Sequence, residues 1–99
     1  MLNPDNLRHE LSATLLSFGT TTNVLFGRPN PGFAAWKLVV EFTHSLGLGV
    51  VSVWESGDCD IDFLPEGSRD GITLHGEFES DSELLHFVAS SVPPLLVRK

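Results

Sequence analysis

The sequence predicts an α+β fold, a two-layer sandwich in which a mostly antiparallel sheet of about five strands carries an N-terminal and a C-terminal helix on one face. Near both ends of the chain, apolar side chains recur every three or four residues, as they do on one side of a helix. Between them, apolar and polar side chains alternate, as in strands. The links between the alternating stretches are too short for helical crossovers, so neighbouring strands must run antiparallel. Since each strand has one apolar face, both helices are expected to cover that face.

The first helix is expected over residues 4–18. Asn3 can cap its N-terminus, and Pro4 suits its first position. Gly19 supplies the left-handed residue that ends many helices. The apolar stripe of this helix consists of Leu7, Leu11, Leu15 and Phe18.

The strands are expected where apolar residues alternate or β-branched and aromatic residues gather. The clearest is 34–43, which places Trp36 in the core. Ser56-Gly57 predicts a tight hairpin turn, and residues 44–49 a turn region. Residues 28–32 predict a loop, either a plain connection, which is favoured, or a mobile loop with a role of its own. The expected strands cover residues 20–28, 34–43, 50–55, 58–64 and 72–79.

The second helix is expected to begin after Ser80, because Ser80 and Glu83 form a capping-box pattern. Pro93-Pro94 should end it, since proline has no backbone N–H group to donate. Its apolar stripe consists of Leu84, Leu85, Val88 and Val92.

Size and composition predict a single domain over residues 1–99. A lone cysteine, Cys59, excludes an intrachain disulfide and fits a reducing compartment. The first ten residues lack the basic start and apolar run of a signal peptide, and no stretch is apolar enough to span a membrane. We therefore expect a cytoplasmic protein. The net charge of −7 argues against nucleic acid and against an anionic membrane surface as partners.

The negative charge is concentrated in one stretch. Residues 55–83 hold ten carboxylates and a single cation, Arg69, whereas the remaining seventy residues hold three acids and five bases. A solvated face that keeps the protein soluble is one explanation. A basic binding partner is the other, and the scarcity of interspersed cations favours it, because a sheet that gathers like charge on one face works against its own stability.

The last two strands should bring these acids together. If Ile61 and Phe63 share a face with Ile72 and Leu74, the register is restricted. Asp62 then lies opposite Thr73 or His75, and Asp60 lies opposite His75 or Glu77. Beside this hairpin, Trp54 is out of phase with the buried valines of its strand. It is either a partly exposed aromatic anchor of an interface or an ordinary packing residue.

Metal binding and catalysis find no support in the motifs. The Asp58-x-Asp60-x-Asp62 pattern is not an EF-hand loop, because Phe63 and Arg69 occupy the sixth and twelfth positions. The histidines lack a short ligand spacing, and one cysteine cannot build a structural zinc site. Alternation places Cys59 in the core and His75 outside, so these two cannot form a catalytic pair. We expect no catalytic, cofactor-binding or metal-binding residues.

The segment Val50 to Phe63, VVSVWESGDCDIDF, resembles the TriTu family of bacterial immunity proteins. The later run from Glu77 to Leu85 into a closing helix fits the same family, and the resemblance covers roughly residues 36–92. It implies a cognate immunity protein of the kind linked to type VI secretion. Such a protein protects its producer from an ADP-ribosyltransferase toxin that modifies elongation factor Tu, by obstructing the toxin's NAD or target site, without catalysis and without a cofactor.

The leading hypothesis is therefore a monomer that plugs the basic cleft of a toxin domain in a 1:1 complex. A small acidic adaptor or secretion-chaperone-like module without inhibitory role is the alternative, and an enzyme is a third class. Phase and charge, not the resemblance, select the expected partner-binding residues: Trp54, Glu55, Asp58, Asp60, Asp62, His75, Glu77 and Glu79.

Overall fold

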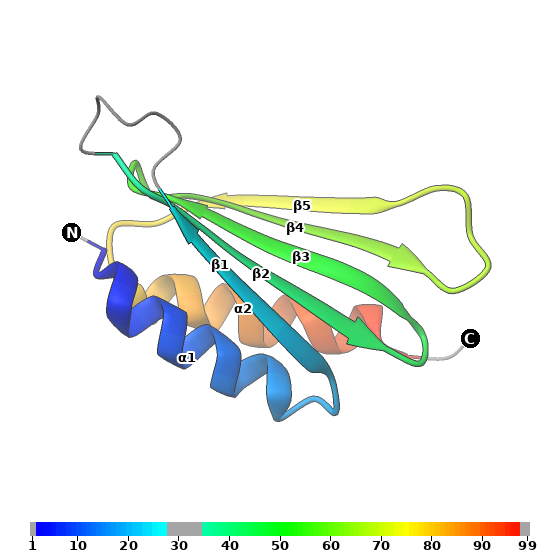
Figure 1. Ribbon diagram of the computed structural model, residues 1–99. Helices are drawn as coiled ribbons and strands as arrows, with labels where there is room; N and C mark the ends of the chain where they lie inside the picture. The colour runs from blue at the N-terminus through cyan, green and yellow to red at the C-terminus, as the bar shows by residue number, and fades with distance from the viewer. Residues whose placement is uncertain (1, 28–34, 98–99) are drawn as a thin grey trace.

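A computed structural model describes residues 2–27 and 35–97 and confirms the expected fold class (Figure 1). The predicted loop at 28–32 lies outside the described residues. The elements, in chain order, are α1 (Pro4–Leu16), β1 (Thr21–Gly27), β2 (Lys37–His44), β3 (Gly47–Trp54), β4 (Asp58–Pro65), β5 (Ile72–Glu77) and α2 (Asp81–Leu95).

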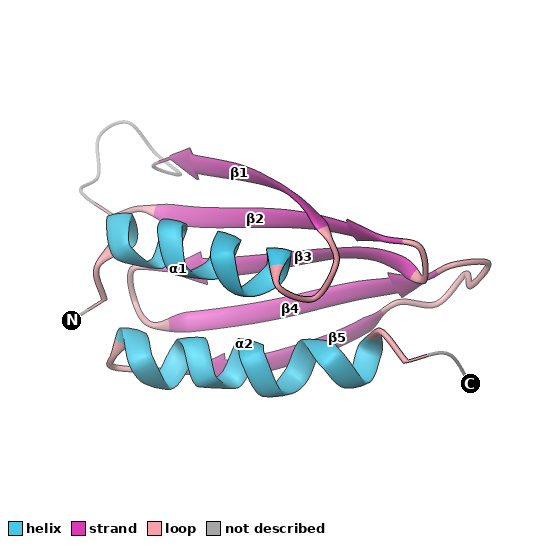
Figure 2. Cartoon of the chain, turned by 90° about the horizontal axis from the view of Figure 1, so that it is seen from below, coloured by secondary structure: helices cyan, strands magenta, loops and turns pink. Residues whose placement is uncertain are grey.

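The sheet has the strand order β1-β2-β3-β4-β5, and every neighbouring pair is antiparallel. Both helices lie on one face of it, with α1 against β1 and β2, and α2 against β4 and β5 (Figures 1 and 2). The other face is covered by no element of the described chain, and we call it the open face. None of the described helices has the length and hydrophobicity needed to cross a membrane.

The core fills the space between the helices and the sheet. The two helical stripes contribute six fully buried residues, Leu7, Leu11, Leu15, Leu84, Val88 and Val92. The alternating strand residues contribute Trp36, Leu38, Val40, Phe42, Val51, Val53, Cys59, Ile61 and Phe63. The predicted core position of Trp36 is confirmed.

The helix starts are capped as expected and are also joined to each other. The Asn3 side chain accepts hydrogen bonds from two backbone N–H groups of the first turn of α1, and the Ser80 side chain accepts one from the Glu83 N–H at the start of α2. The Asp81 carboxylate accepts from the Asn3 backbone N–H at 3.0 Å and from Asn6 Nδ2 at 2.7 Å. One acid of the negative stretch therefore serves to hold the two helix starts together.

The prediction that Pro93-Pro94 ends the second helix is wrong, because α2 continues to Leu95. The fixed φ of proline is compatible with a helix, although Pro93 and Pro94 cannot donate to the carbonyls of Ala89 and Ser90. The last turn closes through a hydrogen bond from the Leu96 N–H to the Pro93 carbonyl at 3.0 Å.

The turn expected over residues 44–49 is shorter than predicted, because β3 already begins at Gly47. Gly49 belongs to this strand and pairs with Phe42. A Cβ atom at Gly49 would lie 2.0 Å from the ring of Phe42, which is buried and stacks on Phe63 with 6.3 Å between ring centroids. This glycine therefore makes room for an aromatic ring in the core and does not form a turn.

Ile72 was expected to be in the core, but 41% of it is exposed. It lies on the helix side of the sheet, opposite Phe63. The reason for its exposure is a groove of about 680 Å³ at the C-terminal end of α2, which Ile72 lines together with Leu95 and Val97. The helix does not fill the space over this end of β5.

Replacing Gly49 with alanine should lower the free energy of unfolding by about 1–3 kcal/mol, because the added methyl group overpacks the buried ring of Phe42. Urea unfolding measures the effect. Gly27→Ala is the matched control, since a Cβ at this strand position meets no atom within 4 Å. Equal midpoints for the two variants would contradict the assigned packing role.

Candidate functional site

The hairpin of β4 and β5 gathers acidic side chains on the open face. Its cross-strand pairs on this face are Asp58 with Glu77, Asp60 with His75, and Asp62 with Thr73. Of the two registers that the sequence allowed, the structure has the one that places Asp62 opposite Thr73 and Asp60 opposite His75. We call the group Asp58, Asp60, Asp62, His75 and Glu77 the acidic face.

The core on the other side of the sheet determines which face the aspartates take. Cys59, Ile61 and Phe63 alternate with the three aspartates of β4 and are 0–2% exposed, in contact with the helix layer. A slip of one residue would turn this set toward solvent and bury the aspartates. The positions of the carboxylates therefore follow from the burial of their neighbours in the chain.

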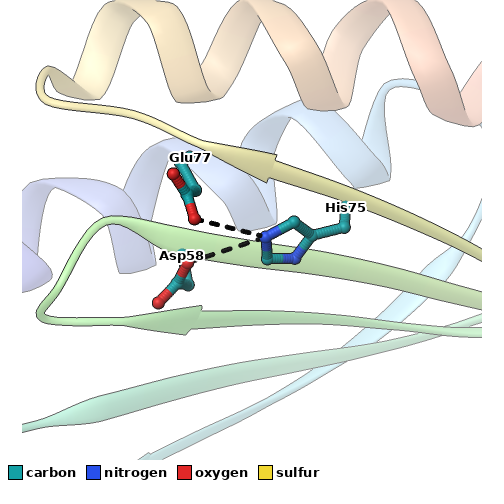
Figure 3. Close-up of side chains that lie close together, drawn as sticks. All are labelled: Asp58, His75 and Glu77. Atoms are coloured by element: carbon teal, nitrogen blue, oxygen red, sulfur yellow. Dashed lines mark ion pairs between the residues drawn. The ribbon is translucent and has the colours of Figure 1, made fainter.

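His75 pairs with three carboxylates of the acidic face, and Figure 3 shows two of them, Asp58 and Glu77. Its Nδ1 makes a short hydrogen bond to Asp60. Its Nε2 lies 3.6 Å from Asp58 Oδ1 and 3.9 Å from Glu77 Oε1. Within the described residues, these acids form ion pairs with His75 alone.

The surroundings of His75 favour its protonated form. The hydrogen bond to Asp60 raises the pKa of His75 above its ordinary value of 6.5, and partial desolvation opposes this rise. The charges of Asp60, Asp58 and Glu77 raise the pKa further. The acidic face thus carries an internal counter-ion whose charge depends on pH.

Hydroxyl groups orient two of the aspartates. Thr73 Oγ1 donates to Asp62 at 2.7 Å across the strands, and Ser56 Oγ donates to Asp58 at 2.7 Å within the β3–β4 turn. Ser56 had been assigned only to the turn, so the sequence reasoning missed this contact. A hydroxyl two residues before an aspartate is a common local pattern, and it is the signal that could have indicated it.

Two neighbouring hollows show which predicted residues come together. The first, of about 330 Å³, is lined by Trp54, Ser56, Asp58, Asp60 and His75. The second, of about 490 Å³, is lined by Ser56, Asp58, Glu77, Phe78, Glu79 and Glu83. Asp58 lines both hollows, and together the two are lined by six of the eight predicted residues and by Glu83, which was not predicted.

The remaining two predicted residues lie outside these hollows. Asp62 is one cross-strand pair further along β4, beside Thr73. Glu55 lies in the β3–β4 turn, where its side chain is exposed and lines neither hollow. The structure therefore separates Glu55 from the acids that follow it in the sequence.

Trp54 is half-buried on the open face, and Lys37 covers its ring. Lys37 Nζ lies 4.7 Å from the ring centroid, close enough for a cation–π contact. The two residues are direct cross-strand partners between β2 and β3. In the sequence, Arg69 is the one cation within residues 55–83. The fold brings a second cation, Lys37, to the border of the acidic face.

Exposed leucines lie next to the acidic face on the same side of the sheet. Leu48 is 54% exposed and Leu64 is 41% exposed, and they are cross-strand partners. With Val50, Asp62 and Thr73 they line a shallow pocket of about 230 Å³. The apolar patch of Leu48 and Leu64 was not predicted from the sequence, although the alternation of both residues with buried neighbours could have indicated it.

Cys59 does not meet His75, as expected. Burial and, to a lesser extent, the charge of Asp60 together raise the pKa of the Cys59 thiol to about 12. The thiol is therefore protonated at neutral pH and shielded in the core, on the opposite side of the sheet from His75.

No known protein-family model matches this sequence, and a search of curated proteins gives no match either. The TriTu resemblance therefore stays a prediction that rests on the residues quoted for it.

The raised pKa of His75 predicts a pH dependence. The stabilising effect of its protonation should be complete below about pH 6.5 and should be lost as the pH rises through the folded-state pKa. An NMR titration of the imidazole should give a pKa above 6.5 that falls toward 6.5 in Asp60→Asn, while Glu10→Gln on α1 leaves it unchanged. A value at or below 6.5 in the unaltered protein would show that the carboxylates do not act on this ring.

Proposed function

We propose that this chain is a cytoplasmic immunity protein that binds and neutralises a cognate antibacterial ADP-ribosyltransferase toxin by occluding its active site. One observation carries the binding part of the proposal: several carboxylates project from a single uncovered face of the sheet. The class of toxin comes from the TriTu resemblance alone.

Electrostatics supports a cationic partner. Asp58 and Glu77 are directly opposite each other in the register, and such like-charged pairs destabilise a sheet by about 0.2–1 kcal/mol. His75 offsets this repulsion only in part, since its Nε2 is beyond hydrogen-bond distance of both carboxylates. Lysine and arginine side chains of a partner would turn the repulsion into attraction and speed up association.

The apolar groups beside the acidic face supply apolar contact area for an interface, which charged side chains alone do not provide. Specific interfaces combine an apolar centre with a polar rim. The open face offers Leu48 and Leu64 on one side of the acids and Trp54 on the other. A toxin domain whose cleft binds the diphosphate of NAD would present the complementary cations, and a single copy of this chain would cover it in a 1:1 complex.

A small acidic adaptor or chaperone-like module is the second candidate, because the same surface would also hold a partner without inhibiting it. Growth rescue separates the two. An immunity protein restores growth of cells that express its cognate toxin domain, to be sought in the neighbouring open reading frame, whereas an adaptor binds the domain and leaves the cells inhibited.

The double variant Asp60→Lys, Glu77→Lys should weaken binding to that toxin domain by several kcal/mol, because it reverses charge at the centre of the acidic face. It should also slow association and abolish growth rescue. Surface plasmon resonance gives the rates, and co-expression gives the rescue.

The control is Glu10→Lys, Asp70→Lys, which makes the same change in net charge on α1 and in the β4–β5 loop. This control should bind and protect as the unaltered protein does. Unchanged affinity and protection in the hairpin variant would place the interface elsewhere on the molecule.

A further inference from the structure

We propose that Asp58, His75 and Glu77 form a binding site for one Zn²⁺ ion on the open face, with Asp60 as the residue that positions the imidazole (Figure 3). This inference does not depend on the proposed function, and it is tested with the metal alone. The sequence motifs favoured no metal site, because their ligand spacings apply to residues within one segment of the chain. Here they come from two strands.

The distances between the ligand atoms carry the first part of the argument. His75 Nε2 lies 3.6 Å from Asp58 Oδ1 and 3.9 Å from Glu77 Oε1, and the three ligand atoms lie within 4.8 Å of one another. These separations are too long for hydrogen bonds. Zinc binds nitrogen and oxygen at about 2.0–2.2 Å, so two ligands at a tetrahedral ion lie about 3.4 Å apart. Small side-chain movements would bring all three into that arrangement.

The orientation of His75 carries the second part. Its Nδ1 is held by Asp60, which leaves Nε2 directed at Asp58 and Glu77. Metal-binding histidines commonly donate their other ring N–H to a carboxylate, which determines the tautomer and makes the ligand nitrogen more basic. Asp60 is in place for this role.

The types of ligand select the metal. An imidazole nitrogen favours zinc over magnesium and calcium, which prefer sites made entirely of oxygen. Two carboxylates supply the negative charge that offsets the ion. The three side chains are 40–79% exposed, so a water molecule can complete a four-coordinate site.

Isothermal titration of the untagged protein with ZnCl₂ at pH 7.5 should show one zinc ion bound per chain. In long-range ¹H–¹⁵N spectra, zinc should shift Nε2 of His75 more than Nδ1. Excess Mg²⁺ should not displace the zinc. His75→Gln and Glu77→Gln should each weaken binding at least about tenfold, and Asp60→Asn should weaken it about 10–100-fold.

The matched control is His86→Gln, which removes an exposed histidine from α2 on the other layer of the fold. It should bind zinc as the unaltered protein does. The proposal is overturned by the absence of one-to-one binding, by a loss in His86→Gln equal to that in His75→Gln, or by zinc shifts that bypass the His75 ring. The spectra of the unaltered protein decide the matter even if a variant fails to fold.

Discussion

The register between β4 and β5 is the constraint on which the surface of this protein depends. Burying a side chain such as Ile61 or Phe63 contributes about 1.5–3 kcal/mol, whereas a like-charged cross-strand pair costs about 0.2–1 kcal/mol. The core therefore determines which side chains of the hairpin face outward, and the carboxylates that alternate with it lie on the open face. Helices on one side of the sheet and acids on the other are two results of the same alternation.

His75 gives this charged surface its internal organisation. One ring nitrogen is held by Asp60, and the other faces the opposed pair Asp58 and Glu77. A proton on the ring, a zinc ion between the three side chains, or the cations of a partner would each offset the same negative charge. These occupants compete for overlapping groups, so the proposed zinc site and the proposed protein interface are linked by electrostatics even though each is tested separately.

The elements and their faces could be predicted because periodicity reports directly which side chains are buried. The register could be narrowed only to two choices, since a shift of two residues keeps every apolar side chain on its face. Contacts from distant segments could not be predicted: Lys37 reaches Trp54 from β2, and Asp81 joins the two helix starts. Pro93-Pro94 misled because the two prolines remove N–H donors but adopt helical backbone angles, so α2 includes them and ends one residue later.

The central claim is that the acidic face meets a cationic partner, and NMR mapping of the complex tests it most directly. Titrating ¹⁵N-labelled protein with its proposed cognate toxin domain should perturb the Trp54 indole and the amides of Asp58, Asp60, His75 and Glu77, and should leave the outer surfaces of α1 and α2 unchanged. Perturbations confined to the helices, with the β4–β5 hairpin unaffected, would contradict the account.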